Sequence, residues 1–372
     1  MINFTIEKTD ILRALSHIQN VVERRQTVPI LSNVLLEVKS DNGGSLQIQA
    51  TDNELEFSEL VPANVASEGA ITVPAHKLYD VIKKLPDGAQ VQCVQKADQF
   101  MVSCGRSRFA LPTLDAENFP HMKEEDFTCT FMLTTAQLQG LIDRTQFAMS
   151  TEETRYNLNG IFLHVHKADK SLLKAVAIDG HRLACSQVEL PEGADSMPAV
   201  IVPRKTVGEL TRLLGELQQD VSVSVCANQI RFSFGRAVLS SRLIDGIYPD
   251  YEVVIPTSND KVMEVDSAAF TSAVDRVAVI SERSRGIKLS LKKGVVHLAA
   301  AATDEGSAED ELDVAYDASA LEVGFNYRYL LDILAQVQCG TARFSFSDAS
   351  TPVVIQDAQD NTALYVLMPM RV

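Results

Sequence analysis

The chain has 372 residues, of which 46% are hydrophobic and 22% charged, and its formal net charge is −15 at pH 7. This is the composition of an ordinary globular protein of about two or three domains rather than of a disordered or fibrous chain. No stretch is apolar enough to span a membrane and the first residues lack a secretion signal, so we expect a cytoplasmic protein. The acidic balance alone argues against nucleic-acid binding, because phosphate contacts need Lys and Arg.

The predicted elements recur with a period of roughly 125 residues. In chain order, the first copy has an amphipathic helix over 9–22, strands over 33–38 and 46–57, a helix over 73–85 that opens on Val-Pro, and an alternating strand over 89–95. The second copy repeats this at 135–149, 160–165, 173–184, 202–214 and 220–227. The third repeats it at 267–280, 286–291, 295–306, 324–337 and 342–348. The turn residues Asp52, Asp179 and Asp304 fall at matching positions.

The repeats predict an α+β fold built from three copies of one unit, each with two helices packed on antiparallel sheets. Polar stretches at 123–126 and 257–260 mark the expected joins, which gives domains at 1–125, 126–256 and 257–372. A generic α+β protein with similar local patterns is the alternative.

In both cases we expect the six cysteines to be free thiols, and no metal or cofactor, because they lie far apart with no CxxC pair. They are Cys93, Cys104, Cys129, Cys185, Cys226 and Cys339.

The basic residues gather on the predicted helices or at their ends, whereas acidic residues crowd the predicted connections at 115–119, 192–195 and 304–313. Such helices would offer phosphates a weakly attractive surface that does not read bases. Taken one helix at a time, ordinary solvated faces are the better explanation, and it is the repetition over six helices that favours the phosphate surface. The basic residues are Lys8, Arg13, Arg24, Arg25, Lys77, Lys83, Lys84, Arg144, Arg204, Lys205, Arg212, Arg276, Arg283, Arg285 and Arg328.

Several segments closely resemble the bacterial replicative DNA polymerase III beta subunits, the sliding clamps, in the right order along essentially the whole chain. The segments are TVPILSN (27–33), CGRSRFALPTL (104–114), RYNLNG (155–160), DGHRLA (179–184), IVPRK (201–205), IDGIYPDY (244–251), GFNYRYLLDIL (324–334) and LMPMRV (367–372). The resemblance implies a head-to-tail homodimer whose six domains close a ring around duplex DNA. It also implies a non-catalytic role: the ring tethers other replication proteins to DNA.

By resemblance, the dimer interface sets Lys77, Phe109 and Leu111 against Val279 and Ile280 of the other subunit. A contact that closes after two subunits needs unlike patches of this kind. The apolar members could instead be ordinary core residues. The family's DNA contacts correspond to Arg25, Arg204 and Lys205, supported by Arg24 and Tyr156, and each could equally be a generic surface residue.

The resemblance further implies a peptide pocket between the second and third domains. It would bind short linear motifs with Leu and Phe anchors from the replicative polymerase catalytic subunit, the clamp loader, translesion polymerases and repair proteins. Ile178 and Val253 depart from the family pattern, and both make the rim more apolar. The implied walls are Arg155, Leu158, Gly180, His181, Arg182, Leu183, Pro249, Val254, Tyr329, Leu367, Met368, Pro369, Met370 and Arg371.

Two other functions remain open from the residues. Asp179, His181 and Arg182 could serve acid–base catalysis, but no nucleophile signature, phosphate-binding loop or metal spacing accompanies them. A sequence-specific DNA-binding protein would need a basic excess and a base-reading element, and the sequence has neither. ATP chemistry would belong to a separate loader.

Overall fold

The computed structural model describes residues 1–25, 27–123, 125–166, 168, 171–281, 283–302 and 306–371. Asp304, one of the three predicted turn residues, lies outside this set. The contacts divide the chain into two compact units. Unit 1 comprises 1–135, 191–198 and 208–243, and unit 2 comprises 136–190, 199–207 and 244–372.

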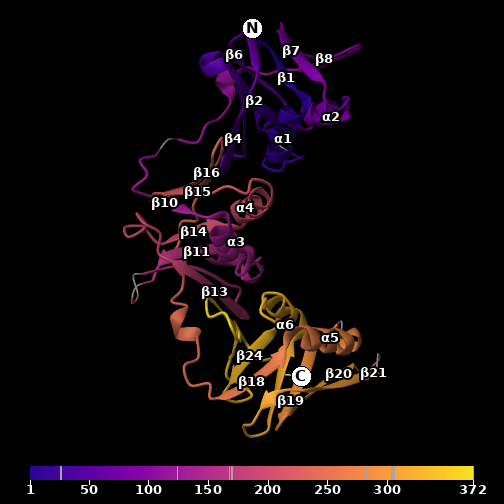
Figure 1. The fold of residues 1–372 in the computed structure, drawn as a ribbon, viewed down its shortest axis with the longest axis vertical. Coiled ribbons are helices and arrows are strands. Elements are labelled where there is room, and N and C mark those ends of the chain that lie inside the picture. Colours follow the sequence, from indigo (N-terminus) through magenta and orange to yellow (C-terminus); the bar gives the residue numbers. More distant parts are fainter. Residues whose placement is uncertain are drawn as a thin grey trace. The chain divides into compact units, whose positions relative to one another are not determined.

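All the predicted amphipathic helices are present (Figure 1). The prolines, however, stand before the helices rather than in their first turns. Pro74 and Pro203 are the last residues of strands β6 (Gly69–Pro74) and β14 (Val200–Pro203), and a helix begins at the next residue. Proline is suited to this position because its ring fixes φ and it has no N–H to donate. The helices are α1 (Lys8–Ile18), α2 (Ala75–Lys84), α3 (Thr135–Asp143), α4 (Arg204–Glu216), α5 (Ser267–Ala278) and α6 (Tyr327–Leu334).

Unit 1 contains two antiparallel sheets. Its core lies where α1 packs against α2 and β4, with Ile11, Leu15 and Phe57 fully or almost fully buried. The first sheet runs in the order β5 (Asn64–Ser67), β1 (Asn3–Glu7), β7 (Gln90–Lys96), β8 (Gln99–Cys104) and β9 (Ser107–Pro112). The second runs β10 (Cys129–Leu133), β15 (Val221–Val225), β16 (Gln229–Phe234), β17 (Ala237–Arg242), β4 (Leu55–Pro62), β3 (Ser45–Thr51), β2 (Asn33–Lys39) and β6.

Unit 2 repeats this plan, with α5 packed against α6 and against strands β20 and β21 (Figure 1). Its larger sheet runs β14, β11 (Gly160–Val165), β12 (Leu172–Ile178), β13 (Arg182–Glu189), β26 (Ala363–Leu367), β25 (Val353–Asp357), β24 (Thr341–Phe346), β18 (Lys261–Asp266) and β22 (Ala315–Tyr316). Its smaller sheet runs β21 (Gly306–Asp313), β20 (Val295–Ala302), β19 (Gly286–Lys292) and β23 (Leu321–Asn326).

Each larger sheet joins strands of two successive sequence repeats. In unit 1, β4 of the first repeat pairs with β17 of the second, with Phe57 opposite Leu239. In unit 2, β13 of the second repeat pairs with β26 of the third, with Leu183 opposite Val366. Because main-chain hydrogen bonds cross from one repeat to the next, the compact units do not coincide with the repeats. The domain limits at 125 and 256 remain predictions.

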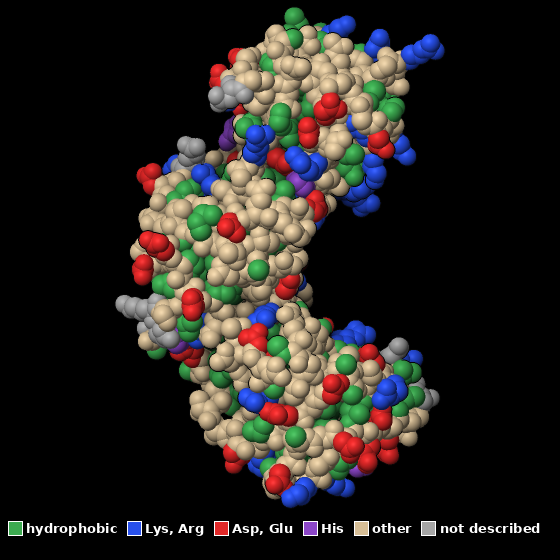
Figure 2. Space-filling model, in the orientation of Figure 1, with side chains coloured by type: hydrophobic (Ala, Val, Ile, Leu, Met, Phe, Trp, Pro, Cys, Tyr) green, Lys and Arg blue, Asp and Glu red, His purple; other side chains and the backbone are tan. Residues whose placement is uncertain are grey.

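The charges are less sorted than the sequence pattern indicates. Lys8 is only 5% exposed, and its Nζ donates to Asp87 Oδ1 and to the Leu85 carbonyl, both at 2.6 Å, so it adds no charge to a helix surface. Arg144 and Arg276 form ion pairs with Asp360 (2.8 Å) and Asp310 (2.6 Å). Residues 306–313 form the edge strand β21 rather than a connection. On the face shown in Figure 2, basic and acidic side chains are interspersed.

Candidate functional site

The turn between β12 and β13 organises the site. Asp179 Oδ1 accepts hydrogen bonds from the main-chain N–H groups of His181 (2.8 Å) and Arg182 (3.0 Å). Gly180 lies at φ +92°, a conformation that glycine adopts without steric cost. A Cβ at this position would stand 2.6 Å from Arg155 Nη1, so glycine also leaves room for that guanidinium. Asp179 therefore has the turn role that its position in the repeat predicts.

Hydrogen bonds and an aromatic contact fix the Arg182 side chain. Its Nε donates to Asp179 Oδ2 (3.0 Å), Nη1 to Asp332 Oδ2 (2.5 Å) and Nη2 to the Phe147 carbonyl (2.6 Å). The guanidinium also lies 4.4 Å from the centre of the Tyr329 ring, within the range of a cation–π contact. Tyr329 in turn stacks against the exposed His181, with 5.8 Å between ring centres. Arg182 is thus a positioning residue that fixes the aromatic side of the site.

An apolar cluster lies beside this turn. Leu158, Leu183, Tyr248 and Val366 belong to one group of buried side chains, and Ile178 packs against it. The cross-strand pair Leu183 and Val366 brings the second and third repeats together at its centre. The sequence-based residue set includes Leu158 and Leu183 but misses Tyr248 and Val366. The alternation of β26 could have placed Val366 on the same face as Leu364, two residues earlier.

The exposed rim comes from two segments: the short helix Glu252–Val254 and the residues that follow β26. Val254 is 45% exposed and Met368 42% exposed, whereas Leu367 is fully buried and offers no surface. The C-terminal segment is fixed by two main-chain bonds: Met368 N–H to the His181 carbonyl and Met370 N–H to the Gly324 carbonyl, both 2.9 Å. Arg155, Pro249 and Arg371 are also exposed, and Pro369 is half-buried. All the predicted wall residues belong to unit 2, where main-chain hydrogen bonds connect the turn at His181 with the C-terminal segment.

Burial disfavours the charged forms of ionisable groups in and beside the cluster. It raises the pKa of the Cys185 thiol to about 11 and raises the pKa of Tyr248 and of Tyr251. It lowers the pKa of His164, whose Nε2 lies 3.1 Å from Tyr251 Oη. Within the described ranges, no group of three His, Cys, Asp or Glu side chains is placed to hold a metal ion. The arrangement suits binding of an apolar ligand.

The predicted DNA-facing residues have mixed surroundings. Arg24 and Arg25 are exposed beyond the end of α1 in unit 1. In unit 2, Tyr156 is 58% exposed and Lys205 is also exposed. Arg204 Nη2 donates to the carbonyls of Met149 (2.5 Å) and Ser150 (2.8 Å), and burial lowers the pKa of its guanidinium. Arg204 therefore also has a structural role at the start of α4.

The predicted interface residues lie near sheet edges. Phe109 and Leu111 belong to β9, the last strand of its sheet, and Leu111 is 9% exposed. Lys77 lies on α2. Val279 is 69% exposed in the short helix Val279–Ser281, and its neighbour Ile280 is half-buried. In unit 2, β21 is one of the two edge strands of the smaller sheet.

Three family models match successive parts of the chain: the DNA polymerase III beta subunit N-terminal domain at residues 2–123, its central domain at 132–250 and its C-terminal domain at 252–371. The chain belongs to the DNA polymerase III beta subunit family. The family resemblance inferred from sequence segments is thereby confirmed. Members of this family are sliding clamps, non-catalytic processivity subunits of the polymerase, so the chain is not an enzyme.

Individual relatives cover the whole chain. The beta sliding clamp of Caulobacter vibrioides is 45% identical and that of Escherichia coli 36% identical, each with 99% of both chains covered. The sliding clamp of Bartonella birtlesii, solved bound to griselimycin, superposes with a TM-score of 0.96 at 45% identity and full coverage of both chains. A Caulobacter crescentus clamp, solved with polyethylene glycol bound to a putative beta-motif tethering region, also gives 0.96, at 44% identity over 100% of this chain and 99% of that one.

The α+β fold predicted from the repeats and the three clamp domains implied by the resemblance are likewise confirmed by these matches. No helix in the described part of the chain is long and apolar enough to cross a membrane.

Proposed function

We propose that this clamp subunit tethers its partners through the apolar cluster of unit 2, with Arg155, His181, Val254, Tyr329 and Met368 around it. The observation that carries the proposal is the pairing of Leu183 with Val366 beside a rim of exposed apolar side chains. Burying a Leu or Phe side chain against such a surface contributes about 1.5–3 kcal/mol. Methionine at the rim adapts to ligands of different shape.

The occupants are short linear motifs with Leu and Phe anchors. We assign them to the replicative polymerase catalytic subunit, the clamp loader, translesion polymerases and repair proteins. The two relatives solved with griselimycin and with polyethylene glycol support a ligand-binding clamp surface. Val253, which is 78% exposed, and Ile178 add apolar surface where the family often has polar side chains, so the part of the site beside these two residues favours apolar ligand side chains.

The peptide site is tested by a matched pair of valine substitutions. Val254 and Val262 are exposed to nearly the same degree, 45% and 43%, but Val262 lies on β18, away from the cluster. Val254→Asp places a carboxylate where the anchors bind, so a labelled peptide with Leu and Phe anchors should bind at least about tenfold more weakly. Val262→Asp should bind the peptide as the unsubstituted protein does. Equal affinities for the two variants would refute the assignment of the site.

The second part of the proposal is the ring. Two subunits join head to tail, with Lys77, Phe109 and Leu111 of one against Val279 and Ile280 of the other, and duplex DNA passes through the hole without being read. The exposed Val279 and two of the edge strands, β9 and β21, support this arrangement, because an edge strand can pair with a strand of another chain. Arg24, Arg25, Tyr156, Arg204 and Lys205 would face the DNA. We place the assembly in the cytoplasm.

Retention on DNA tests the ring. The protein is loaded onto a nicked circular plasmid with a clamp loader and ATP, and half of the sample is then linearised. A ring stays on circles and runs off linear ends, because topology rather than affinity holds it. Equal retention on both forms would mean that direct contacts hold the DNA.

A further inference from the structure

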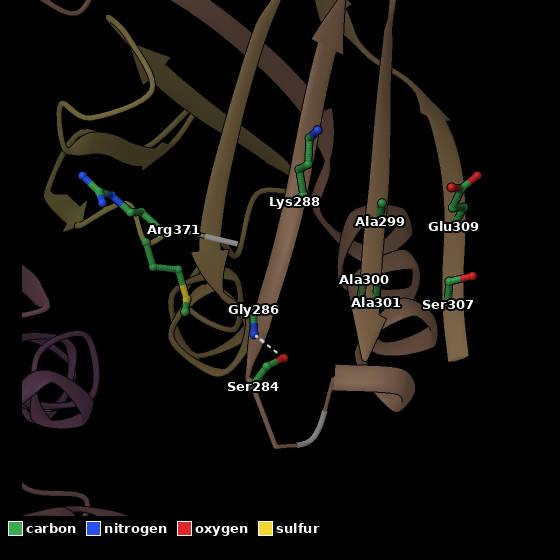
Figure 3. Close-up of a pocket in the computed structure, with 10 residues that line it drawn as sticks. Ser284, Gly286, Lys288, Ala299, Ala300, Ala301, Ser307, Glu309 and Arg371 are labelled. Carbon is green, nitrogen blue, oxygen red and sulfur yellow. Dashed lines mark hydrogen bonds between the residues drawn. The ribbon is translucent and has the colours of Figure 1, made fainter. Parts of the chain in front are cut away.

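A trough crosses the outer face of the smaller sheet of unit 2, opposite the face that packs against α5 (Figure 3). A hollow of about 370 Å³ lies over β19, β20 and β21, and its floor consists of small residues: Gly286, Ala299 and Ala301. A second hollow of about 400 Å³ adjoins it over β19 and β23. The two share Lys288, Met370 and Arg371, so they form one trough. Volumes of this size fit a small ligand or a short piece of chain.

The trough is continuous with the peptide site. Met368 is bonded to the turn that carries His181, and Met370, two residues later, is bonded to Gly324 on β23. From there a single row crosses the sheet, since Gly324 pairs with Lys288, and Lys288 with Ala299. Two extended residues span about 7 Å, so a peptide anchored beside Leu183 needs only a short flank to reach the trough.

Lys288 is the charged group best placed to recognise such a flank. Lys288 forms an ion pair with Glu322 (2.8 Å), and the two side chains are 41% and 66% exposed. Exposed ion pairs of this kind contribute little to stability. The lysine can therefore exchange this partner for an incoming carboxylate. The exposed Arg371, which is labelled in Figure 3 and lines both hollows, adds a second positive charge. Glu309, two strands away from Lys288 on β21, would repel an acidic residue placed farther along.

We propose that this trough is an extension of the peptide site and binds, in extended form, the segment next to the anchors of a linear motif, with an acidic side chain at Lys288. The inference rests on the peptide site proposed above and names a feature of its ligands. The small floor residues admit a peptide main chain close to the sheet, and continuity through Met368–Met370 identifies the occupant as the same peptide. Partners with an acidic flank should thus bind more tightly than partners with the anchors alone.

The test compares labelled peptides on the full-length protein by fluorescence anisotropy. One peptide carries only the Leu and Phe anchors; the others add a flank of about four residues on either side, with one Asp or with Asn in its place. We expect one Asp flank to tighten binding about fivefold over the anchor peptide and over its Asn counterpart. Lys288→Gln, and Ala299→Gln, which fills the trough, should abolish this gain without changing the affinity of the anchor peptide.

Lys292→Gln is the matched control, because Lys292 lies on the same strand but outside the lining of the trough, and it should keep the gain. If neither flank tightens binding, or if the gain survives in both Lys288→Gln and Ala299→Gln, the trough is not part of the site while the peptide site itself stands. If the anchor peptide does not bind at all, both proposals fall.

Discussion

The turn at 52–55 in unit 1 and the turn at 179–182 in unit 2 share one local design. In each, an aspartate accepts hydrogen bonds from two N–H groups that follow it, and the next residue, Asn53 or Gly180, has positive φ, at 78° and 92°. The strand that follows then pairs with the last strand of the next repeat. The outcomes differ: Leu55 is buried in its sheet, whereas Arg182 reaches Asp332, Phe147 and Tyr329.

This difference shows how one copy of a repeated unit acquires contacts that the other copy lacks. The aspartate and the left-handed residue specify the turn in both places. The residues after them decide whether the turn only closes a hairpin or also aligns side chains such as Tyr329 and His181. A substitution in the shared part should therefore affect both turns alike, and one in the divergent part should affect binding at the second turn alone.

The largest expected contrast is between Arg182→Ala and Leu55→Ala. Arg182→Ala leaves Asp332 and Asp179 without their cation, and we expect the free energy of unfolding to fall by about 3 kcal/mol. Leu55→Ala creates a cavity of comparable cost, about 3 kcal/mol. Only Arg182→Ala should also weaken anchor-peptide binding, by about tenfold, because His181 and Tyr329 lose their alignment. Urea denaturation and anisotropy measure the two quantities. Equal loss of peptide binding in both variants would remove the distinction between the turns.

A smaller contrast concerns the left-handed residues. Gly180→Ala adds a Cβ at φ +92° and 2.6 Å from Arg155 Nη1, so it should cost about 1 kcal/mol of stability and displace that arginine. Peptide affinity should fall about threefold, because less than 1 kcal/mol of binding is lost. Asn53→Gly, at the equivalent turn, should change stability by less than about 0.5 kcal/mol and leave binding unaltered. A loss of peptide affinity in Asn53→Gly would contradict this reading.

The smallest contrast is one of pH, between two hairpins inside the larger sheets, β25–β26 in unit 2 and β16–β17 in unit 1. In unit 2, burial raises the pKa of Asp357 and Asp360, but hydrogen bonds from Gln359 and Cys339 to the first, and from Thr362 and Arg144 to the second, outweigh it and leave both pKa values lowered. In unit 1 the hairpin between β16 and β17 turns through Gly235 and Arg236, without a carboxylate.

A carboxyl with a lowered folded pKa stabilises the fold above its unfolded pKa, near 4, and this stability is lost as pH falls through the folded value. Amide exchange in β26 should therefore accelerate, relative to β17, as the pH falls below about 4, by an amount equivalent to less than about 1 kcal/mol. Asp360→Asn should flatten the dependence. An equal response of the two strands would show that these carboxylates do not control the hairpin.

Sequence patterns predicted much of the fold and part of the site. Alternation and helical spacing predicted the six helices and most strands, because both depend on which face of an element is buried. The family segments pointed to Leu158, Leu183 and the C-terminal methionines, which belong to the proposed site. They did not predict Val366 and Tyr248, whose places depend on which strand lies beside which. Lys8 was grouped with surface cations because its partner, Asp87, is distant in the sequence.

The sequence by itself determined the local structures: the tripled pattern of helices and strands, and the aspartate turns, whose hydrogen bonds connect residues two or three positions apart. Only the tertiary structure decided that β13 of one repeat pairs with β26 of the next, that Arg182 meets Asp332, and that the C-terminal segment joins the apolar cluster to the trough over β19. The alternation of apolar and polar residues specifies which face of a strand is buried, but not which strand pairs with it. Whether a charged side chain is paired depends on which distant residue the folded chain brings into contact with it.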